Sequence, residues 1–184
     1  MLDKIALVIA AVEGTRMRSD IPKVLHQVCG LPMLEHVLRS LGSVCGDQYV
    51  IVGHNKEKVI AAYHSKVEFI EQVAGGWGTG WAIRCCEHVL KGKKGVVLIT
   101  AGDMPLVRTE TFARLVAEVE SGKNAAALLT DVVDNPFGYG RYTGAYTEPE
   151  YYYFESYEEL EEFYKNYYGA AGEYDGSGLN PQNS

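Results

Sequence analysis

A run of seven apolar residues near the start of the chain constrains the fold more than any other feature. Residues 5–11 read IALVIAA, a pattern typical of a strand buried on both faces of a parallel sheet. A turn with Gly14, Arg16 and Lys23 follows. Glycine lets backbone N–H groups approach a ligand, and basic side chains attract anions. The sequence therefore predicts a phosphate-binding turn, and the alternative is a βα turn with solvated basic residues.

Strands and helices alternate along the rest of the chain. Apolar runs predict strands at 4–11, 48–53, 67–71, 95–100 and 124–132. Apolar positions with helical spacing predict helices at 32–44, 55–64, 80–90 and 109–121. This alternation favours an α/β fold with a parallel sheet and helices on both faces. Ligands in such sheets bind where the strands have their carboxyl ends.

The composition argues against several classes of partner. The net charge of −7 is unlike that of a general nucleic-acid binder. No apolar segment is long enough to span a membrane, and the first residues lack the layout of a secretory signal. The four cysteines form no zinc-binding pattern. We expect a cytoplasmic protein with reduced thiols that binds small molecules rather than nucleic acid or membrane.

The end of the chain differs from its body. From Thr143 onward the sequence holds nine acidic residues, one lysine and nine of the thirteen tyrosines. Residues 150–154 predict a strand, and Ser156 with Glu159 forms a capping-box pattern before a helix. We expect a main domain at 1–142, a strand–helix extension packed on it at 143–168, and a disordered tail at 169–184.

Three further segments contain residues suited to chemistry. Asp103 follows an apolar strand, where a carboxylate could hold Mg²⁺ against a phosphate or could cap a turn. Gly78 and Thr79 lie in a glycine-rich loop that could admit a flat base or be an ordinary flexible loop. Residues 138–141 (GYGR) could line a ligand cleft or form a turn between strands.

Taken in order, these segments resemble the uridylyltransferase domain of bacterial N-acetylglucosamine-1-phosphate uridylyltransferases, a family of nucleotide-diphospho-sugar pyrophosphorylases. Residues 9–26 (IAAVEGTRMRSDIPKVLH) are similar to that family's opening pattern, L-A-A-G-x-G-T-R-M-x-S-x-x-P-K-V-L-H. The remaining matches are short motifs: 30–33 (GLPM), 78–80 (GTG), 102–106 (GDMPL) and 138–141 (GYGR). The resemblance covers roughly residues 4–142.

The resemblance implies a Rossmann-like three-layer α/β/α sandwich and a reaction. UTP and N-acetylglucosamine 1-phosphate would give UDP-N-acetylglucosamine and pyrophosphate, with Mg²⁺ as cofactor. It also implies roles for individual residues, as follows: Ala10, Ala11 and Gly14 contact the nucleotide through the backbone, Arg16 meets the leaving pyrophosphate, Lys23 neutralises the reacting phosphates, Gln72, Gly78 and Thr79 lie at the uracil, Asp103 holds Mg²⁺, and Gly140 contacts the sugar.

The chain also departs from the family pattern. Val12 stands where the family has glycine, and Gln72 matches the family's uracil-reading glutamine only with a shift of one residue. The family's later V-E-x-K and E-I-N-T-G segments, which supply sugar and metal contacts, have no recognisable counterpart here. Two alternatives to an active uridylyltransferase therefore stay open. One is a nucleotide-binding protein with little turnover, and the other is a related enzyme that uses another nucleotide or sugar.

Overall fold

The computed structural model of the chain describes residues 3–11, 17–63, 66–76, 78–130 and 151–154. The fold divides into two compact units, Met1–Val116 and Ala117–Ser184. The first unit contains the parallel sheet and all of the predicted site residues that the structure describes. Each unit is considered by itself below.

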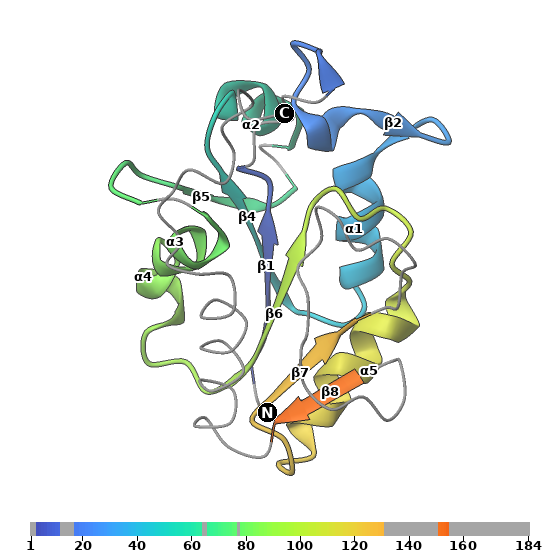
Figure 1. The fold of residues 1–184 in the computed structure, drawn as a ribbon, viewed down its shortest axis with the longest axis vertical. Helices are drawn as coiled ribbons and strands as arrows, with labels where there is room; N and C mark the ends of the chain where they lie inside the picture. Colours follow the sequence, from blue (N-terminus) through green and yellow to red (C-terminus); the bar gives the residue numbers. More distant parts are fainter. Residues whose placement is uncertain (1–2, 12–16, 64–65, 77, 131–150, 155–184) are drawn as a thin grey trace, which may run out of the picture. The chain divides into compact units, whose positions relative to one another are not determined.

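The first unit is built on a four-stranded sheet in the order β5-β4-β1-β6 (Figure 1). The strands are β1 (Asp3–Ile9), β4 (Asp47–Val52), β5 (Glu68–Glu71) and β6 (Gly95–Ala101). All three pairings are parallel, with Ile9 beside Ile51 of β4 on one side and beside Ala101 of β6 on the other. The predicted parallel α/β fold is confirmed.

Helices lie on both sides of this sheet (Figure 1). They are α1 (Met33–Leu41), α2 (Lys56–Tyr63), α3 (Gly78–Arg84), α4 (Glu87–Leu90) and α5 (Thr109–Glu120). On one face Ala82 of α3 and Cys86 form a buried cluster with Ile5, Leu7 and Ile51 of the strands. Successive side chains of a strand point to opposite faces of the sheet, so Val8, which lies next to Leu7, points to the other face. The four buried leucine and valine residues of α1 line that helix's core-facing side. The result is the three-layer sandwich that the sequence predicted.

The strand order reverses direction beside β1. The chain passes from β1 to β4 and β5 on one side, and then returns to place β6 on the other side of β1. Ligands in open α/β sheets bind at such a switch point, outside the carboxyl ends of the strands. The carboxyl ends of β1 and β6 are therefore where the fold favours a ligand.

Two local features differ from the sequence prediction. Two helices stand where the sequence predicted a single helix at 80–90. The chain leaves the helical path at Cys85 and Cys86, and the side chain of Cys86 is fully buried. A short hairpin, β2 (Gln27–Val28) with β3 (Leu31–Pro32), was not predicted. Its two-residue turn has positive φ at Cys29 and Gly30, the geometry of a tight hairpin turn.

The second unit contains an antiparallel pair, β7 (Ala126–Leu129) with β8 (Tyr151–Phe154). This pair confirms that strands form within residues 124–132 and 150–154, with shorter bounds than expected. The capping-box pattern, the tail and the expected domain boundaries after residues 142 and 168 lie outside the described residues. Among the described helices, none is long and apolar enough to cross a membrane.

Candidate active site

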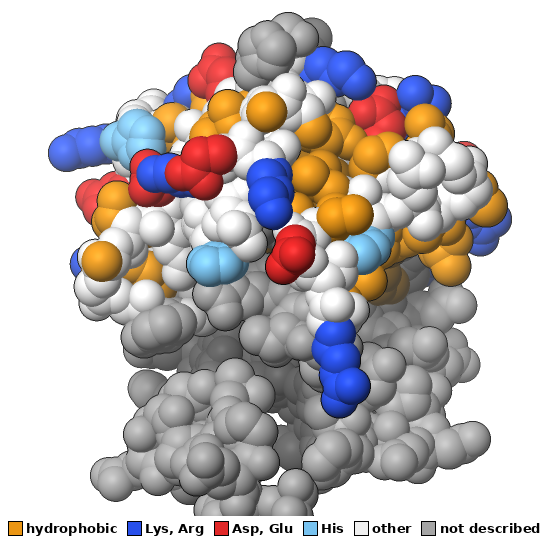
Figure 2. Space-filling model, turned by 90° about the horizontal axis from the view of Figure 1, so that it is seen from above, with side chains coloured by type: hydrophobic (Ala, Val, Ile, Leu, Met, Phe, Trp, Pro, Cys, Tyr) orange, Lys and Arg blue, Asp and Glu red, His pale blue; other side chains and the backbone are white. Residues whose placement is uncertain are grey.

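Four of the seven predicted site residues that the structure describes follow the carboxyl ends of the parallel strands. Ala10 and Ala11 follow β1, Gln72 follows β5 and Asp103 follows β6. The other three described site residues lie at the start of helical segments: Lys23, Gly78 and Thr79. Gly14, Arg16 and Gly140 lie outside the described residues, as does Val12. Figure 2 views the molecule from this side, where basic and acidic side chains lie close together.

An ion pair between Lys23 and Asp103 lies at the switch point. Lys23 begins η2 (Lys23–Leu25), a single 3-10 turn that starts directly after Pro22. Proline restricts the backbone at that point to an angle compatible with the turn. The Lys23 and Asp103 side chains keep 35% and 26% of their surface exposed. Both charges therefore remain accessible to a ligand.

Gly102 lets the segment that carries Asp103 approach its neighbours. Its N–H donates to the carbonyl of Ile9 at 2.9 Å. A Cβ atom at Gly102 would lie 3.2 Å from the Val24 side chain and 3.3 Å from both the Ile9 carbonyl and the Leu34 side chain. These distances are tighter than ordinary contacts between nonbonded carbon atoms. The absence of a side chain at Gly102 therefore sets the separation between η2 and the end of β6.

The backbone at the end of β1 is held equally closely. The Ala10 N–H donates to the carbonyl of Ile51 at 2.8 Å, and the Ala10 side chain is buried. A Cβ atom at Gly53 would lie 3.1 Å from the Cβ of Ala11. Because Ala10, Ala11 and Gly53 have small side chains or none, the backbone of Ala10 and Ala11 stays close to the carboxyl end of β1, where the fold favours a ligand.

Gln72 and the first turn of α3 lie on the β5 side of the site. The Gln72 N–H donates to the carbonyl of Val52 at 2.8 Å, which extends the β4–β5 pairing by one residue. Beside it, Lys56 forms an ion pair with Glu71. Gly78 has φ of 80°, and a Cβ atom there would meet nothing within 4 Å. Both Gly78 and Thr79 are exposed.

Trp81 is half-buried and packs on the glycine-rich segment that precedes α3, as the sequence predicted for a packing residue, but its particular contacts were not predicted. A Cβ atom at Gly76 would lie 2.3 Å from the indole of Trp81, so the ring packs directly on this glycine. The indole Nε1–H donates to the carbonyl of Val73 at 2.8 Å. The flat group over Gly75 and Gly76 is thus the protein's own indole. Two adjacent glycines near a tryptophan were the available signal.

The site residues extend in a row along the sheet edge. Gln72, Ala11 and Asp103 follow strands β5, β1 and β6, and β4 lies between the first two. Neighbouring strands are about 4.8 Å apart, so three intervals place the outer two strand ends roughly 14 Å from each other. An extended ligand with a polar base at one end and phosphates at the other suits this arrangement.

Asp103 offers one carboxylate that could contribute to a divalent metal site. Among the described residues, no group of three or more His, Cys, Asp or Glu side chains could hold a metal ion. Mg²⁺ usually keeps several waters and binds through one or two carboxylates together with substrate phosphates. A single partly exposed carboxylate beside the Lys23 ammonium, which attracts phosphates, is compatible with such a site.

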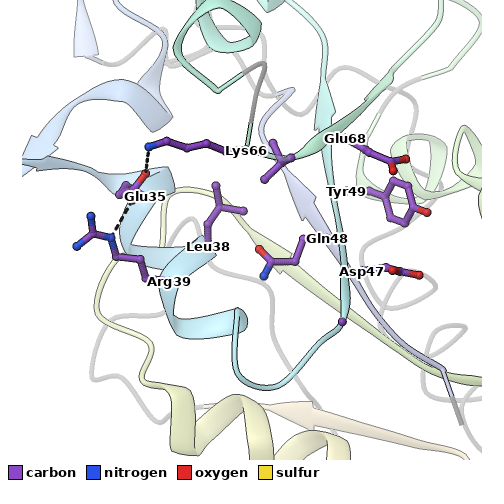
Figure 3. A pocket seen from close by; sticks show the side chains of 10 residues that line it. Glu35, Leu38, Arg39, Asp47, Gln48, Tyr49, Lys66 and Glu68 are labelled. Carbon is purple, nitrogen blue, oxygen red and sulfur yellow. Dashed lines mark hydrogen bonds and ion pairs between the residues drawn. The ribbon is translucent and has the colours of Figure 1, made fainter. Parts of the chain in front are cut away.

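One cavity of the described structure lies away from these residues. It has a volume of about 580 Å³ and is lined by α1 and by the starts of β4 and β5, including Arg39, Asp47 and Glu68 (Figure 3). Glu35 bridges Arg39 and Lys66 across it, at 2.8 Å and 3.3 Å. None of the predicted site residues lines this cavity. The strand ends opposite carry the switch point and are the better candidate for chemistry.

The parallel sheet, its flanking helices and the charged pair at its switch point define a Rossmann-like α/β fold. The chain belongs to the family of MobA-like NTP transferase domains, whose family model matches residues 6–167.

Curated relatives share substantial sequence with the first three quarters of the chain. It is 44% identical over 137 residues to the bifunctional protein GlmU of Streptococcus gordonii, and 46% identical over 139 residues to that of Clostridium beijerinckii. These matches cover 74% and 75% of this chain but 30% of each relative. The resemblance to the uridylyltransferase family is thereby confirmed.

Solved structures share the fold at lower sequence identity. A UDP-glucose pyrophosphorylase from Acinetobacter baumanii aligns with a TM-score of 0.63 at 19% identity, covering 80% of this chain and 63% of that one. Molybdopterin-guanine dinucleotide biosynthesis protein A from Archaeoglobus fulgidus aligns with a TM-score of 0.53 at 22% identity, covering 91% and 74%. These similarities support the Rossmann-like fold.

Proposed function

We propose that the chain is a sugar-phosphate nucleotidyltransferase that joins UTP and N-acetylglucosamine 1-phosphate into UDP-N-acetylglucosamine and pyrophosphate. The observation that carries this proposal is the ion pair of Lys23 with Asp103 at the switch point, beside the backbone of Ala10 and Ala11. The identity of 44–46% to the bifunctional protein GlmU supports the choice of nucleotide and sugar.

The reaction needs no protein nucleophile. A phosphate oxygen of the sugar phosphate attacks the α-phosphorus of UTP, and the bond from that phosphorus to the pyrophosphate oxygen breaks. Catalysis of such a step depends on alignment and on stabilisation of negative charge. The Lys23 ammonium lies beside the Asp103 carboxylate, where it would reach phosphates bound at this edge. Arg16, outside the described residues, would meet the leaving pyrophosphate.

A divalent metal would complete the charge balance. Mg²⁺ bound to substrate phosphates neutralises charge and orients the reacting groups. Asp103 would be its protein ligand, with water and phosphate oxygens as the others. Gly14 would contact the nucleotide through its backbone and Gly140 the sugar, by their place in the family motifs.

The uracil would lie at the β5 end of the row. Gln72 offers an amide that both donates and accepts hydrogen bonds, and Thr79 offers a hydroxyl. Gly78 leaves open space beside them. The base would then bind on the β5 side of β1 and the phosphates on the β6 side, so that the nucleotide would span the row of site residues.

Pyrophosphate release tests the proposal. The chain is incubated with UTP, N-acetylglucosamine 1-phosphate and Mg²⁺, and Asp103→Ala is compared with Asp47→Ala. Asp47 also pairs with a lysine, Lys93, but at the opposite edge of the sheet. We expect release by the unmodified chain and by Asp47→Ala, and a loss of at least a hundredfold for Asp103→Ala. Equal rates for the two variants, or no release at all, would contradict the proposal.

One sequence observation favours a second candidate, a nucleotide-binding protein with little turnover. Val12 replaces a glycine of the family's nucleotide loop, and the later sugar- and metal-binding motifs have no recognisable counterpart. Calorimetry with UTP–Mg²⁺ separates the two: binding without pyrophosphate release supports this candidate. A panel that pairs CTP or GTP with other sugar phosphates tests for a related transferase.

A further inference from the structure

Trp81 joins two segments that are separate in sequence. Its ring lies against Gly75 and Gly76, which come shortly after β5, while the residue itself belongs to α3. A Cβ atom at Gly75 would lie 3.2 Å from the ring, and one at Gly76 would overlap it at 2.3 Å. The Nε1–H bond to the Val73 carbonyl, at 2.8 Å, fixes the orientation of the indole. The contact is therefore both close and directional.

The joined segments are those that would carry the base. Gln72 directly precedes the segment that Trp81 holds, and Gly78 and Thr79 form the first turn of the helix that contains Trp81. The Arg84 guanidinium also lies over the indole, 5.8 Å from the ring centre. A single side chain thus sets the separation between the two halves of the proposed base site.

We propose that Trp81 is a positioning residue for nucleotide binding, an inference that rests on the proposed function. Gly75 has φ of 125°, a conformation that only glycine adopts without strain. Two adjacent glycines lose much conformational freedom when they become ordered. Trp81 orders them before the ligand arrives, so that the nucleotide does not bear this cost on binding.

This role predicts a specific kinetic effect. Trp81 lies among the residues that would hold the base, away from Lys23 and Asp103 at the β6 side. An interaction that holds substrate and transition state equally affects KM and leaves kcat unchanged. Loss of the indole should therefore raise KM for UTP and the dissociation constant of UTP–Mg²⁺ by the same factor.

The test uses the full chain with three variants. Trp81→Phe keeps a ring on the glycines but removes the Nε1–H donor, and Trp81→Ala removes both. Leu90→Ala is the control, because Leu90 is a half-buried residue of α4 that packs on the apolar cluster containing Ala82, the residue next to Trp81 in α3. Thermal unfolding of every variant measures the general loss of stability. Calorimetry with UTP–Mg²⁺ and steady-state pyrophosphate release measure binding and turnover.

We expect KM and the dissociation constant to rise about threefold in Trp81→Phe and about tenfold in Trp81→Ala, about 1.4 kcal/mol for the latter, with kcat within twofold. Leu90→Ala should lose stability but bind UTP as the unmodified chain does. Unchanged binding in Trp81→Ala, or the same change in Leu90→Ala, would overturn the positioning role alone. If the unmodified chain binds no nucleotide, the proposed function fails and the inference fails with it.

Discussion

Replacement of Gly102 by alanine tests how the fold sets the active-site geometry. The added Cβ would meet the Val24 side chain, the Ile9 carbonyl and the Leu34 side chain at 3.2–3.3 Å. Val24 and Leu34 are buried, and Ile9 is part of the central strand, so the groups around the new methyl have little room to move. Overpacking of this kind costs about 1–3 kcal/mol of the free energy of unfolding.

A second glycine provides the matched control. At Gly46 a Cβ atom would meet nothing within 4 Å, and the backbone is not in the left-handed region. Both substitutions reduce the freedom of the unfolded chain by a similar amount, about 0.4–1 kcal/mol in favour of folding. The difference between Gly102→Ala and Gly46→Ala therefore isolates the steric cost at Gly102.

Urea unfolding of both variants measures that difference, expected to be about 1–3 kcal/mol. In thermal unfolding a chain of this size loses about 2–4 °C per kcal/mol. Val24→Ala in the Gly102→Ala background removes the nearest obstacle, so the two substitutions should cost less together than their sum. Equal stabilities for the two alanine variants, or strict additivity with Val24→Ala, would refute the packing argument.

Two further predictions concern pH. Burial raises the pKa of the Cys45 and Cys86 thiols to about 11 each. As the pH rises, these thiols therefore lose their protons in the unfolded chain before they do so in the folded chain. The free energy of unfolding should consequently fall between about pH 9 and pH 11. Urea titrations at both ends of this range check the fall, which Cys86→Ala should reduce. A hydrogen bond from Arg39 holds the pKa of Glu35 below its usual 4.5, so its contribution to stability is present above that pH and is lost as the pH falls through the lowered value. Glu35→Gln should flatten the acid side of the stability profile, and an unchanged acid side would contradict this assignment.

The strands were predictable because their apolar runs report burial directly. Residues 4–11 were expected as a strand, and β1 occupies Asp3–Ile9. The apolar run at 95–100 predicted a strand, and β6 forms there. The same run did not predict that the side chains of Val97 and Ile99 are 40% and 45% exposed. That exposure depends on which strand ends the described sheet, and a local pattern carries no information about strand order.

The site was predictable in its location and less so in its contacts. Ala10 and Asp103 follow neighbouring parallel strands, so their proximity follows from the fold class. The ion pair of Asp103 with Lys23 depends on η2, a single turn too short to produce a helical pattern. The packing of Trp81 on Gly76 likewise depends on how α3 meets the segment after β5. Both are tertiary contacts that spacing alone does not report.

Pyrophosphate release by Lys23→Ala and Lys93→Ala, compared with the unmodified chain, tests the central claim most directly. Both lysines form an ion pair with an aspartate and are about one third exposed, but Lys23 lies at the strand ends of the switch point and Lys93 at the opposite edge. We expect kcat/KM for UTP to fall at least a hundredfold in Lys23→Ala and to stay within twofold in Lys93→Ala. Equal activity of the two variants would contradict the assignment of the switch point as the catalytic site.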